Sequence, residues 1–216
     1  MIDDQSGDLQ SLPYRLFLIS APSGTGKTTL IRALINRVPH LVRSISYTTR
    51  IPRPGEIDGE CYNFICQKRF HDMIKNGDFL EYAEICGNFY GTSLNSTLEG
   101  LKVSDFIMEM DFQGAQRMRE IKFPLLSVFI LPPDYTELES RLKKRNKDGN
   151  GTIQNRLKWA RDEIKHASEY DYLLINDDFN RTIESLITIV NASRLEFKRQ
   201  VSLQNFAIST IFESFT

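Results

Sequence analysis

The sequence contains few cysteines, and none of them has the spacing of a redox or zinc site. Three occur in 216 residues, at Cys61, Cys66 and Cys86. An odd number without a C-x-x-C pair argues against a disulfide framework and against structural zinc, so free, buried thiols are expected. The histidines, which also lack the spacing of metal ligands and receive no role, are His40, His71 and His166.

Excess charge and long apolar runs are also missing. The formal net charge is only −1, which disfavours nonspecific binding to nucleic acid through bulk charge. No apolar run is long enough to cross a bilayer, and nothing in the sequence resembles a signal peptide. We therefore expect a cytoplasmic protein with no nucleic-acid partner and no membrane partner.

Short apolar runs alternate with helix-period patterns along a chain whose length suits one generous domain. Strands are expected at 15–20, 42–47, 61–65, 79–85, 103–111, 125–131 and 172–176. Helices are expected at 28–38, 67–76, 94–100, 113–120, 135–145, 153–169 and from 179 onwards. The alternation predicts an α/β fold with an open parallel sheet flanked by helices. The segment 41–93 interrupts it and is predicted to be an inserted, mostly antiparallel lobe.

The strongest motif is SAPSGTGKTTL, residues 20–30, between an expected strand and an expected helix. A small-residue loop followed by Lys-Thr in this context predicts a phosphate-binding P-loop. Gly24 and Gly26 let backbone N–H groups turn inward around an anion, and the helix N-terminus adds its positive end. Lys27 can reach the β- and γ-phosphates, and the Thr28 hydroxyl can join the coordination shell of Mg²⁺. The first glycine of the usual pattern is Ala21, the smallest replacement.

A second group of polar residues lies in the inserted segment. Arg50 and Arg53 are three residues apart in the loop TTRIPRPGE, where two guanidinium groups can converge on one phosphate. Tyr62 and Tyr90 add phenolic donors of the kind that bind phosphate oxygens. The alternative interpretation of this segment is a solvated, charged loop.

Glu81 lies in FLEYA among apolar neighbours, where a carboxylate needs a partner. Guanine fits because its N1–H and N2 amino group are adjacent donors that one carboxylate accepts together. Adenine has an acceptor at N1 and would leave Glu81 unpaired. Ser46 and Thr92 can then donate to O6 or N7 of the guanine.

Four collinear stretches together resemble the guanylate kinase family, bacterial type: SAPSGTGKTT, SISYTTRIPRPGEIDGECYNF, GDFLEYAEICGNFYGTS and MEMDFQGAQ. The resemblance covers about residues 15–199. It implies a P-loop NTPase-type ATP:GMP phosphotransferase that uses Mg²⁺ with ATP and accepts GMP and dGMP. It further implies a core, a GMP-binding lobe and a mobile lid.

The resemblance also implies roles for individual residues. Those implied to bind ATP are Ala21, Pro22, Ser23, Gly24, Thr25, Gly26, Lys27, Thr28 and Thr29, with Asn176 and Asp177 near the adenine. Those implied to bind GMP are Arg50, Arg53, Tyr62 and Tyr90 on the phosphate, and Ser46, Glu81, Thr92 and Asp111 on the guanine side. Those implied to act in catalysis are Lys27 and the lid arginines Arg141, Arg145 and Arg156. Thr28 is the implied protein ligand of Mg²⁺.

The sequence departs from the family pattern at two places. After one strand the family usually has an acidic residue, isoleucine and aspartate, whereas this chain has Glu109, Met110 and Asp111. The lid of the family usually opens with arginine and glycine, whereas Arg145 is followed here by NKDGNG. The expected division is an extension at 1–13, a guanylate kinase-like domain at 14–199 and an apolar tail at 200–216. Within the domain we expect a core at 14–40 and 94–199, a GMP-binding lobe at 41–93 and a lid at about 141–156.

Two other functions stay open on the sequence. One is a scaffold module of guanylate kinase type that binds phosphoproteins without catalysis, but such modules usually lose the ATP site that is present here. The other is a nucleoside-monophosphate kinase with a different base specificity. The oligomeric state is open between monomer and homodimer.

The tail carries an apolar stripe at helical spacing, which is too short to span a membrane. The stripe consists of Leu203, Phe206, Ala207, Ile211 and Phe215. Because so many large apolar side chains would favour aggregation if exposed, we expect them to be buried. Docking on the same chain is favoured over a subunit contact, since the preceding helix delivers the tail to the surface.

Overall fold

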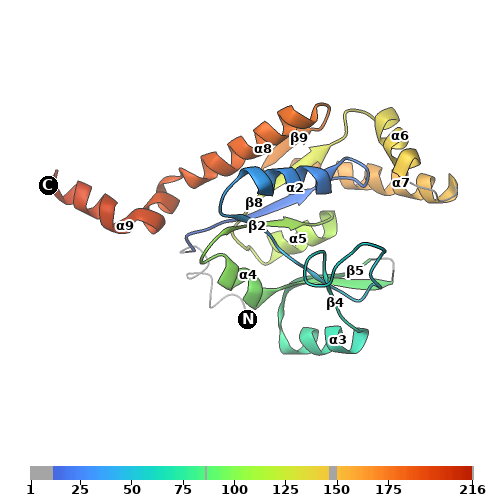
Figure 1. Ribbon diagram of the computed structural model, residues 1–216, viewed down its shortest axis with the longest axis horizontal. Coiled ribbons are helices and arrows are strands. Elements are labelled where there is room, and N and C mark those ends of the chain that lie inside the picture. The colour runs from blue at the N-terminus through green and yellow to red at the C-terminus, as the bar shows by residue number, and fades with distance from the viewer. Residues whose placement is uncertain (1–11, 86, 146–149, 216) are drawn as a thin grey trace.

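The computed structural model describes residues 12–85, 87–145 and 150–215 (Figure 1). A sheet of five parallel strands forms its centre, in the order β2-β7-β1-β8-β9. The strands are β1 (Leu16–Ser20), β2 (Leu41–Arg43), β7 (Asp105–Glu109), β8 (Leu125–Leu131) and β9 (Tyr172–Ile175). The predicted open parallel sheet is confirmed, and the strand that precedes the P-loop lies in its middle.

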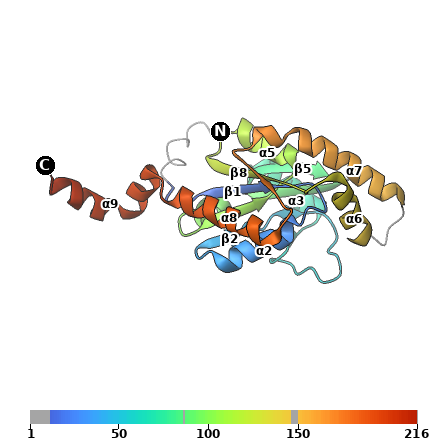
Figure 2. The same ribbon diagram turned by 90° about the horizontal axis from the view of Figure 1, so that it is seen from above.

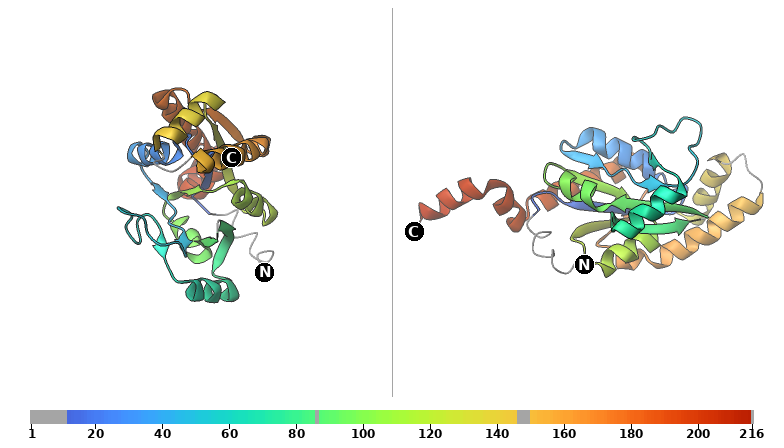
Figure 3. Two further views of the ribbon diagram at one scale, coloured as in Figure 1. Left: turned by 90° about the vertical axis from the view of Figure 1, so that its right-hand side faces the viewer. Right: turned by 90° about the horizontal axis from the view of Figure 1, so that it is seen from below.

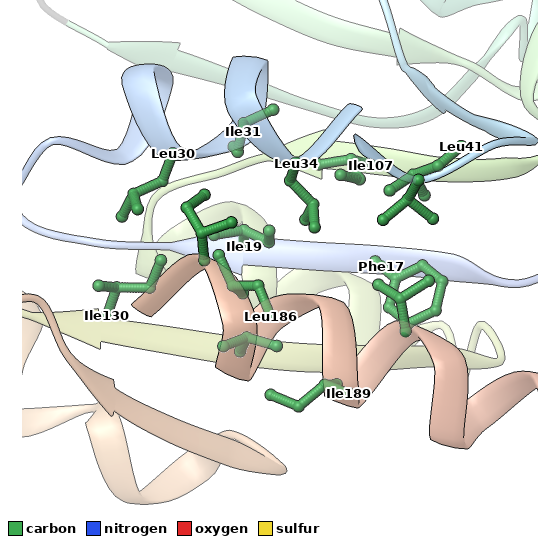
Figure 4. Close-up of a cluster of buried hydrophobic side chains, with 14 of the residues drawn as sticks. Phe17, Ile19, Leu30, Ile31, Leu34, Leu41, Ile107, Ile130, Leu186 and Ile189 are labelled. Carbon is green, nitrogen blue, oxygen red and sulfur yellow. The ribbon is translucent and has the colours of Figure 1, made fainter. Parts of the chain in front are cut away.

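Successive side chains of β1 enter two different hydrophobic cores, as expected for a central strand covered on both faces. Phe17 and Ile19 pack beneath α2 (Lys27–Arg37) and α8 (Phe179–Arg194), as Figure 4 shows. Leu16 and Leu18 face the opposite side, which is covered by α4 (Leu94–Gly100) and α5 (Phe112–Glu120). Burial of each such side chain contributes about 1.5–3 kcal/mol. The base of the P-loop is therefore held rigidly.

The inserted segment forms a second sheet of four strands, in the order β4-β3-β6-β5. Its strands are β3 (Tyr47–Thr48), β4 (Asn63–Phe64), β5 (Phe79–Ile85) and β6 (Asn88–Ser93), and it carries α3 (Gln67–Asn76). The β3–β6 and β5–β6 pairs are antiparallel, whereas β3–β4 is parallel. The mostly antiparallel insert is thus confirmed. Leu80 packs into the second core, which joins this sheet to the central one.

The second sheet depends on a glycine in β6. The rings of Phe70 and Phe79 are stacked, with centroids 4.5 Å apart. A Cβ at Gly91 would lie 2.9 Å from the Phe79 ring, closer than packing allows. No strand was predicted at residues 88–93, where β6 lies, because this glycine interrupts the alternation of apolar and polar side chains.

Two helices form a small unit of their own at the end of the protein opposite to the C-terminus (Figures 1 and 3). They are α6 (Tyr135–Arg145) and α7 (Asn150–Lys165), followed by a 3-10 turn at Ala167–Glu169. They pack on each other through Leu138, Leu142, Ile153, Leu157 and Ala160. This cluster is separate from the two cores of the sheet, so the pair is joined to the domain by fewer apolar contacts than α2, α5 or α8.

The last helix, α9 (Phe197–Glu213), begins at a buried ion cluster and then projects away from the rest of the protein (Figure 2). Asp105, with no exposed surface, accepts from Arg194 Nε at 2.9 Å and also from Arg199. This cluster fixes the start of the helix and directs it outward. Leu203 and Phe215 are 39% and 87% exposed.

The predicted docking of the tail on its own chain is therefore wrong for the described side chains. The ion cluster holds only the first turn of α9, and the backbone leaves helical geometry at Gln204 (φ −126°, ψ 29°), so the kink there sets the course of the residues that follow. Phe206, which belongs to the predicted stripe, has a side chain outside the described residues.

Several predicted boundaries also need correction. The expected strand at 42–47 is divided between the two sheets: Leu41–Arg43 pairs with β7, and Tyr47–Thr48 pairs with β6. The lobe boundary at residue 41 therefore includes a strand of the central sheet. The strand expected at 103–111 ends at Glu109, because Asp111 caps the N-terminus of α5. The residues of the expected extension up to 11, and Cys86, lie outside the described residues.

Cys61 and Cys66 are free thiols, as predicted, but Cys66 is exposed rather than buried. In the described ranges there is no helix of the length and apolar character needed to cross a membrane.

Candidate active site

The segment between β1 and α2 folds as the tight loop that the sequence predicts. Gly24 and Gly26 have φ angles of +96° and +98°, a region that side chains with a Cβ rarely adopt. A Cβ at Gly24 would lie 3.0 Å from Leu142, and one at Gly26 would lie 3.0 Å from the Asn176 amide nitrogen. Both glycines are therefore required by conformation and by close packing. The Thr25 N–H donates to the Pro22 carbonyl at 3.1 Å and closes the loop, and the first N–H groups of α2 are the ones suited to an anion.

Asn176 and Arg141 hold this loop from two directions. The buried Asn176 side chain, which follows β9, donates from Nδ2 to the carbonyl of Thr25 at 2.6 Å. Arg141, on α6, donates to the same carbonyl at 3.2 Å and is paired with Glu137 at 2.7 Å. Asp177, the next residue, is paired with Arg181 at the surface. Of the two residues expected near the adenine, Asn176 thus contacts the P-loop itself.

A cleft of about 770 Å³ opens over the P-loop. The cleft is lined by Ala21, Pro22, Ser23, Gly24, Gly26, Lys27, Thr28, Thr29, Arg141, Lys144 and Glu163. All the predicted ATP-binding residues of the loop except Thr25 line this cleft, and the fully buried Thr25 supplies the carbonyl described above. Lys144 and Glu163 were not among the predicted residues.

Thr28 and Glu109 form the oxygen-rich part of this region. The Thr28 hydroxyl lies 3.4 Å from Glu109 Oε2, and Arg43 lies 2.9 Å from Glu109 Oε1. A hydroxyl beside a carboxylate is a donor set that suits a hard cation such as Mg²⁺. Among the described residues no group of three or more His, Cys, Asp or Glu side chains could hold a metal ion. A cation here would therefore take most of its ligands from phosphate and water.

Arg50 is the centre of an aromatic and acidic group in the second sheet. Its guanidinium donates to Glu56 Oε1 at 2.9 Å and lies over the Tyr62 ring, 5.5 Å from the centroid. The rings of Tyr62 and Tyr90 are 5.9 Å apart, edge to face. Glu56 also accepts from the backbone N–H of Arg53 at 2.7 Å, which fixes the turn between the two arginines. Three of the four predicted phosphate-binding residues lie together here, and the Arg53 side chain is exposed beside them.

Glu81 is largely buried between β5 and β6. Its Oε1 accepts from the Thr92 hydroxyl at 2.8 Å. Burial raises the pKa of the Glu81 carboxyl from 4.5 to about 7, and the bond from Thr92 and the charge of Arg117 oppose that rise. The pairing of Glu81 with Thr92 places two of the predicted guanine-binding residues in contact. Ser46, which is half-buried, lies on the loop before β3 and accepts from the Asn63 N–H through its carbonyl.

Asp111 lies between the two regions. Its carboxylate caps α5 by accepting from the N–H of Gly114 at 2.9 Å. The Asp111 charge contributes to raising the pKa of Glu81 in the second sheet and also that of Glu163 in the P-loop cleft.

The geometry of the two regions matches a known family. The family model described as guanylate kinase covers residues 14–193. The chain belongs to the guanylate kinase family. A guanylate kinase of Alkalilimnicola ehrlichii is 47% identical over 194 residues, which are 89% of this chain and 95% of that protein. A guanylate kinase of Coxiella burnetii is 47% identical over 182 residues, 84% of this chain and 88% of that protein.

A solved structure agrees with this assignment. The crystal structure of guanylate kinase from Anaplasma phagocytophilum is similar with a TM-score of 0.70 at 31% identity, covering 89% of this chain and 92% of that chain. The family match ends within α8. Helix α9 therefore lies beyond the matched segment.

The lid residues of the guanylate kinase family can be placed only in part. Arg156 is half-buried on α7, and Arg141 contacts the P-loop as described. The side chain of Arg145 lies outside the described residues. Arg156 and Glu163 are seven residues apart and so share a face of α7.

Sequence reasoning missed three acidic residues of this guanylate kinase site. Glu56 orders Arg50, Glu109 lies next to Thr28, and Glu163 lines the cleft. No signal in the sequence marked Glu163, because a carboxylate beside the apolar stripe of a helix is the ordinary amphipathic pattern. Glu109 could be found only after the sheets were placed, since Thr28 is 81 positions away, whereas the partners of Glu56, Arg50 and Arg53, are six and three residues away in the same loop.

Proposed function

We propose that this chain transfers the γ-phosphoryl group of ATP to GMP, giving ADP and GDP, and that dGMP is a second acceptor. The observation that carries the proposal is that the chain combines a P-loop cleft with a carboxylate, Glu81, that the Thr92 hydroxyl orients on the second sheet. One region offers a double acceptor for a guanine edge, and the other offers a nest for a triphosphate. dGMP is included because the proposed contacts are to base and phosphate.

On the acceptor side, ionised Glu81 would accept from N1–H and N2–H of guanine, with Thr92 and Ser46 as further polar contacts. Thr92 already donates to Glu81, which orients the carboxylate before any ligand arrives. Arg50, Tyr62 and Tyr90 would bind the GMP phosphate, and Glu56 keeps Arg50 in place for it. Arg53 is assigned to the same phosphate, and Asp111 to the guanine side.

On the donor side, the P-loop amides from Ala21 to Thr29 would cradle the triphosphate, and Lys27 would contact its β- and γ-phosphates. Asn176 would support the loop through Thr25, and Asp177 would lie toward the adenine. Arg141, Arg145 and Arg156 are assigned to the transferring phosphoryl group. We take residues of about 141–156 as the lid, which belong to the end of α6 and the start of α7, since the separate hydrophobic cluster of these helices lets them move together.

Phosphoryl transfer needs positioned cations more than covalent chemistry. The transition state spreads negative charge over the transferring group, with the attacking and leaving oxygens in line. Lys27 and the lid arginines supply positive charge to that group, while Arg50 and Arg53 hold the attacking phosphate. No general base is required, because a nucleotide phosphate oxygen is already ionised near neutral pH. Closure of the lid and lobe would exclude water and so prevent hydrolysis of ATP.

We assign Mg²⁺ as the cofactor, held by the Thr28 hydroxyl next to Glu109 and by the phosphates of ATP. When bound, it would neutralise part of the charge of the ATP phosphates. We also assign the activity to the cytoplasm, where ATP and GMP are available, and propose no nucleic-acid or membrane partner.

A coupled assay of ADP release tests the proposal. GMP, dGMP, AMP and UMP are compared as acceptors with MgATP, and each reaction is repeated with EDTA. The expected result is turnover with GMP and dGMP only, abolished by EDTA. Turnover with AMP or UMP would instead indicate another nucleoside-monophosphate kinase, and ATP binding without turnover would indicate a scaffold module.

A further inference from the structure

Glu163 is an acidic residue in a cleft that is otherwise suited to anions. Among the described residues that line the P-loop cleft, the charged ones are Lys27, Arg141, Lys144 and Glu163. A negative charge at this place repels the triphosphate of ATP, so it weakens nucleotide binding. Its presence in the cleft therefore needs another reason.

Glu163 is also costly to keep charged. Its side chain is half-buried, and burial raises the pKa of its carboxyl to about 7. Within the described part of the chain, its carboxylate accepts no hydrogen bond, in contrast to Glu81. A glutamine of the same shape would remove the desolvation cost without changing the packing. The carboxylate is thus not explained by stability.

The positive charge that acts most on Glu163 is that of Lys27. This charge lowers the pKa of Glu163, and the charge of Asp111 raises it. The two side chains reach the cleft from different elements, Lys27 from the start of α2 and Glu163 from the last turn of α7. Among the described residues, no ion pair or hydrogen bond of Lys27 fixes its ammonium group.

We propose that Glu163 is a positioning residue that holds the Lys27 ammonium at the P-loop, ready for the β- and γ-phosphates of ATP. This inference rests on the proposed kinase function. A lysine is a compact charge on a flexible four-carbon stem, so its orientation must be set by a neighbour. Glu163 sets it by attraction across the cleft, at the expense of some affinity for ATP.

The first test is Glu163→Gln, with Asp162→Asn as the matched control on the same helix. Asp162 is paired with Lys165 at 2.7 Å and does not line the cleft. We expect kcat with GMP to fall by about tenfold in Glu163→Gln, which corresponds to about 1.4 kcal/mol. The KM for ATP should stay equal or decrease, since a repulsive charge is removed. Asp162→Asn should match the wild type in both parameters.

Binding is measured separately by titrating MgATP against the fluorescence of Trp159, the single tryptophan, which lies one turn before Glu163 on α7. Equal or tighter binding by Glu163→Gln is expected. Weaker binding would overturn the proposal, because it would show that Glu163 merely shapes the pocket. Circular dichroism and thermal unfolding of each variant verify that the fold is kept.

A double-mutant comparison tests whether Glu163 acts through Lys27. The Lys27→Met protein and the Lys27→Met/Glu163→Gln protein should have equal residual kcat, because the second change has nothing left to position. A further tenfold loss in the double variant would overturn the proposal, as would wild-type kcat in Glu163→Gln alone.

A third measurement does not depend on turnover. The pKa of the Glu163 carboxyl is followed by ¹³C NMR in the wild type and in Lys27→Met. It should be higher in the variant, because the ammonium charge that lowers it is gone. An unchanged pKa would overturn the proposal even if the protein is active. If the wild type fails to phosphorylate GMP, the kinase function fails, and this titration still decides whether Glu163 faces Lys27.

Discussion

Glu81 and Glu163 are two carboxylates with similar pKa values in regions of opposite design. Burial raises the pKa of each to about 7. In the second sheet, Glu81 is oriented by the Thr92 hydroxyl at 2.8 Å. In the P-loop cleft, Glu163 has no such donor among the described residues. The positive charge of Lys27 attracts its carboxylate and lowers its pKa instead.

The difference shows that burial sets how costly a carboxylate is, whereas its neighbours set what it can do. A carboxylate fixed by a hydroxyl is ready to accept two parallel N–H groups from a planar base. A carboxylate without a hydroxyl donor that shares its cleft with a flexible ammonium is suited to orient that ammonium. The acceptor region is therefore built to select a ligand, and the donor region is built to position charge on one.

The largest expected effect is a loss of kcat when a residue of the donor region, Lys27, is changed. Lys27→Met should lower kcat by several hundredfold, about 3–4 kcal/mol of transition-state stabilisation, while the fold stays intact. The loss follows because a positioned charge at the phosphates is removed. Steady-state kinetics with GMP and a thermal unfolding curve measure both quantities. Turnover near the wild-type rate would exclude Lys27 from the mechanism.

Glu81→Gln addresses the acceptor region alone. The variant keeps the shape but replaces a double acceptor with one acceptor and one donor. We expect a loss of about 2–3 kcal/mol in kcat/KM for GMP, as for a buried polar group left mispaired. The affinity for ATP should hardly change. If the parameters for both substrates shift together, Glu81 is structural and the comparison of the two regions fails.

The raised pKa of Glu81 predicts that GMP binding depends on pH. Free Glu81 is largely protonated below pH 7, whereas guanine with its N–H donors selects the ionised form. The affinity for GMP should be complete above pH 7 and should fall by about tenfold for each unit below it, about 1.4 kcal/mol per unit. Calorimetric titrations from pH 5.5 to about 8.5 measure it. The comparison with Glu81→Gln removes the contribution of the GMP phosphate, and an equal slope in both proteins would contradict the assignment.

The smallest effect is expected from the tail, which lies outside both regions. Truncation after Gln200 should change the free energy of unfolding by less than about 1 kcal/mol, because Leu203, Ile211 and Phe215 are exposed. Kinetics with ATP and GMP should be unchanged. Light scattering of the full chain and the truncated chain decides between monomer and homodimer. A large drop in melting temperature without a change in mass would show that the tail packs on its own chain after all.

Much of this protein could be predicted from local patterns. The P-loop was evident because two glycines, a lysine and a threonine must follow one another for backbone amides to surround a phosphate. The φ angles of Gly24 and Gly26 agree with that requirement. The α/β alternation and the helix at 67–76 were likewise predicted from spacing, since hydrophobic periodicity is a local property.

Sites that depend on burial and on distant partners were beyond the sequence. Glu163 and Lys27 are 136 positions apart by number, and only the order of the sheet and the return of α7 bring them to one cleft. The raised pKa of Glu163 exists only because the folded chain removes its carboxylate from water. The sequence also placed the tail wrongly, because its apolar stripe suggested burial, while the ion cluster of Asp105 with Arg194 and Arg199 and the kink at Gln204 decide its direction. Spacing thus determined which elements form, and the packing of distant residues determined what they face.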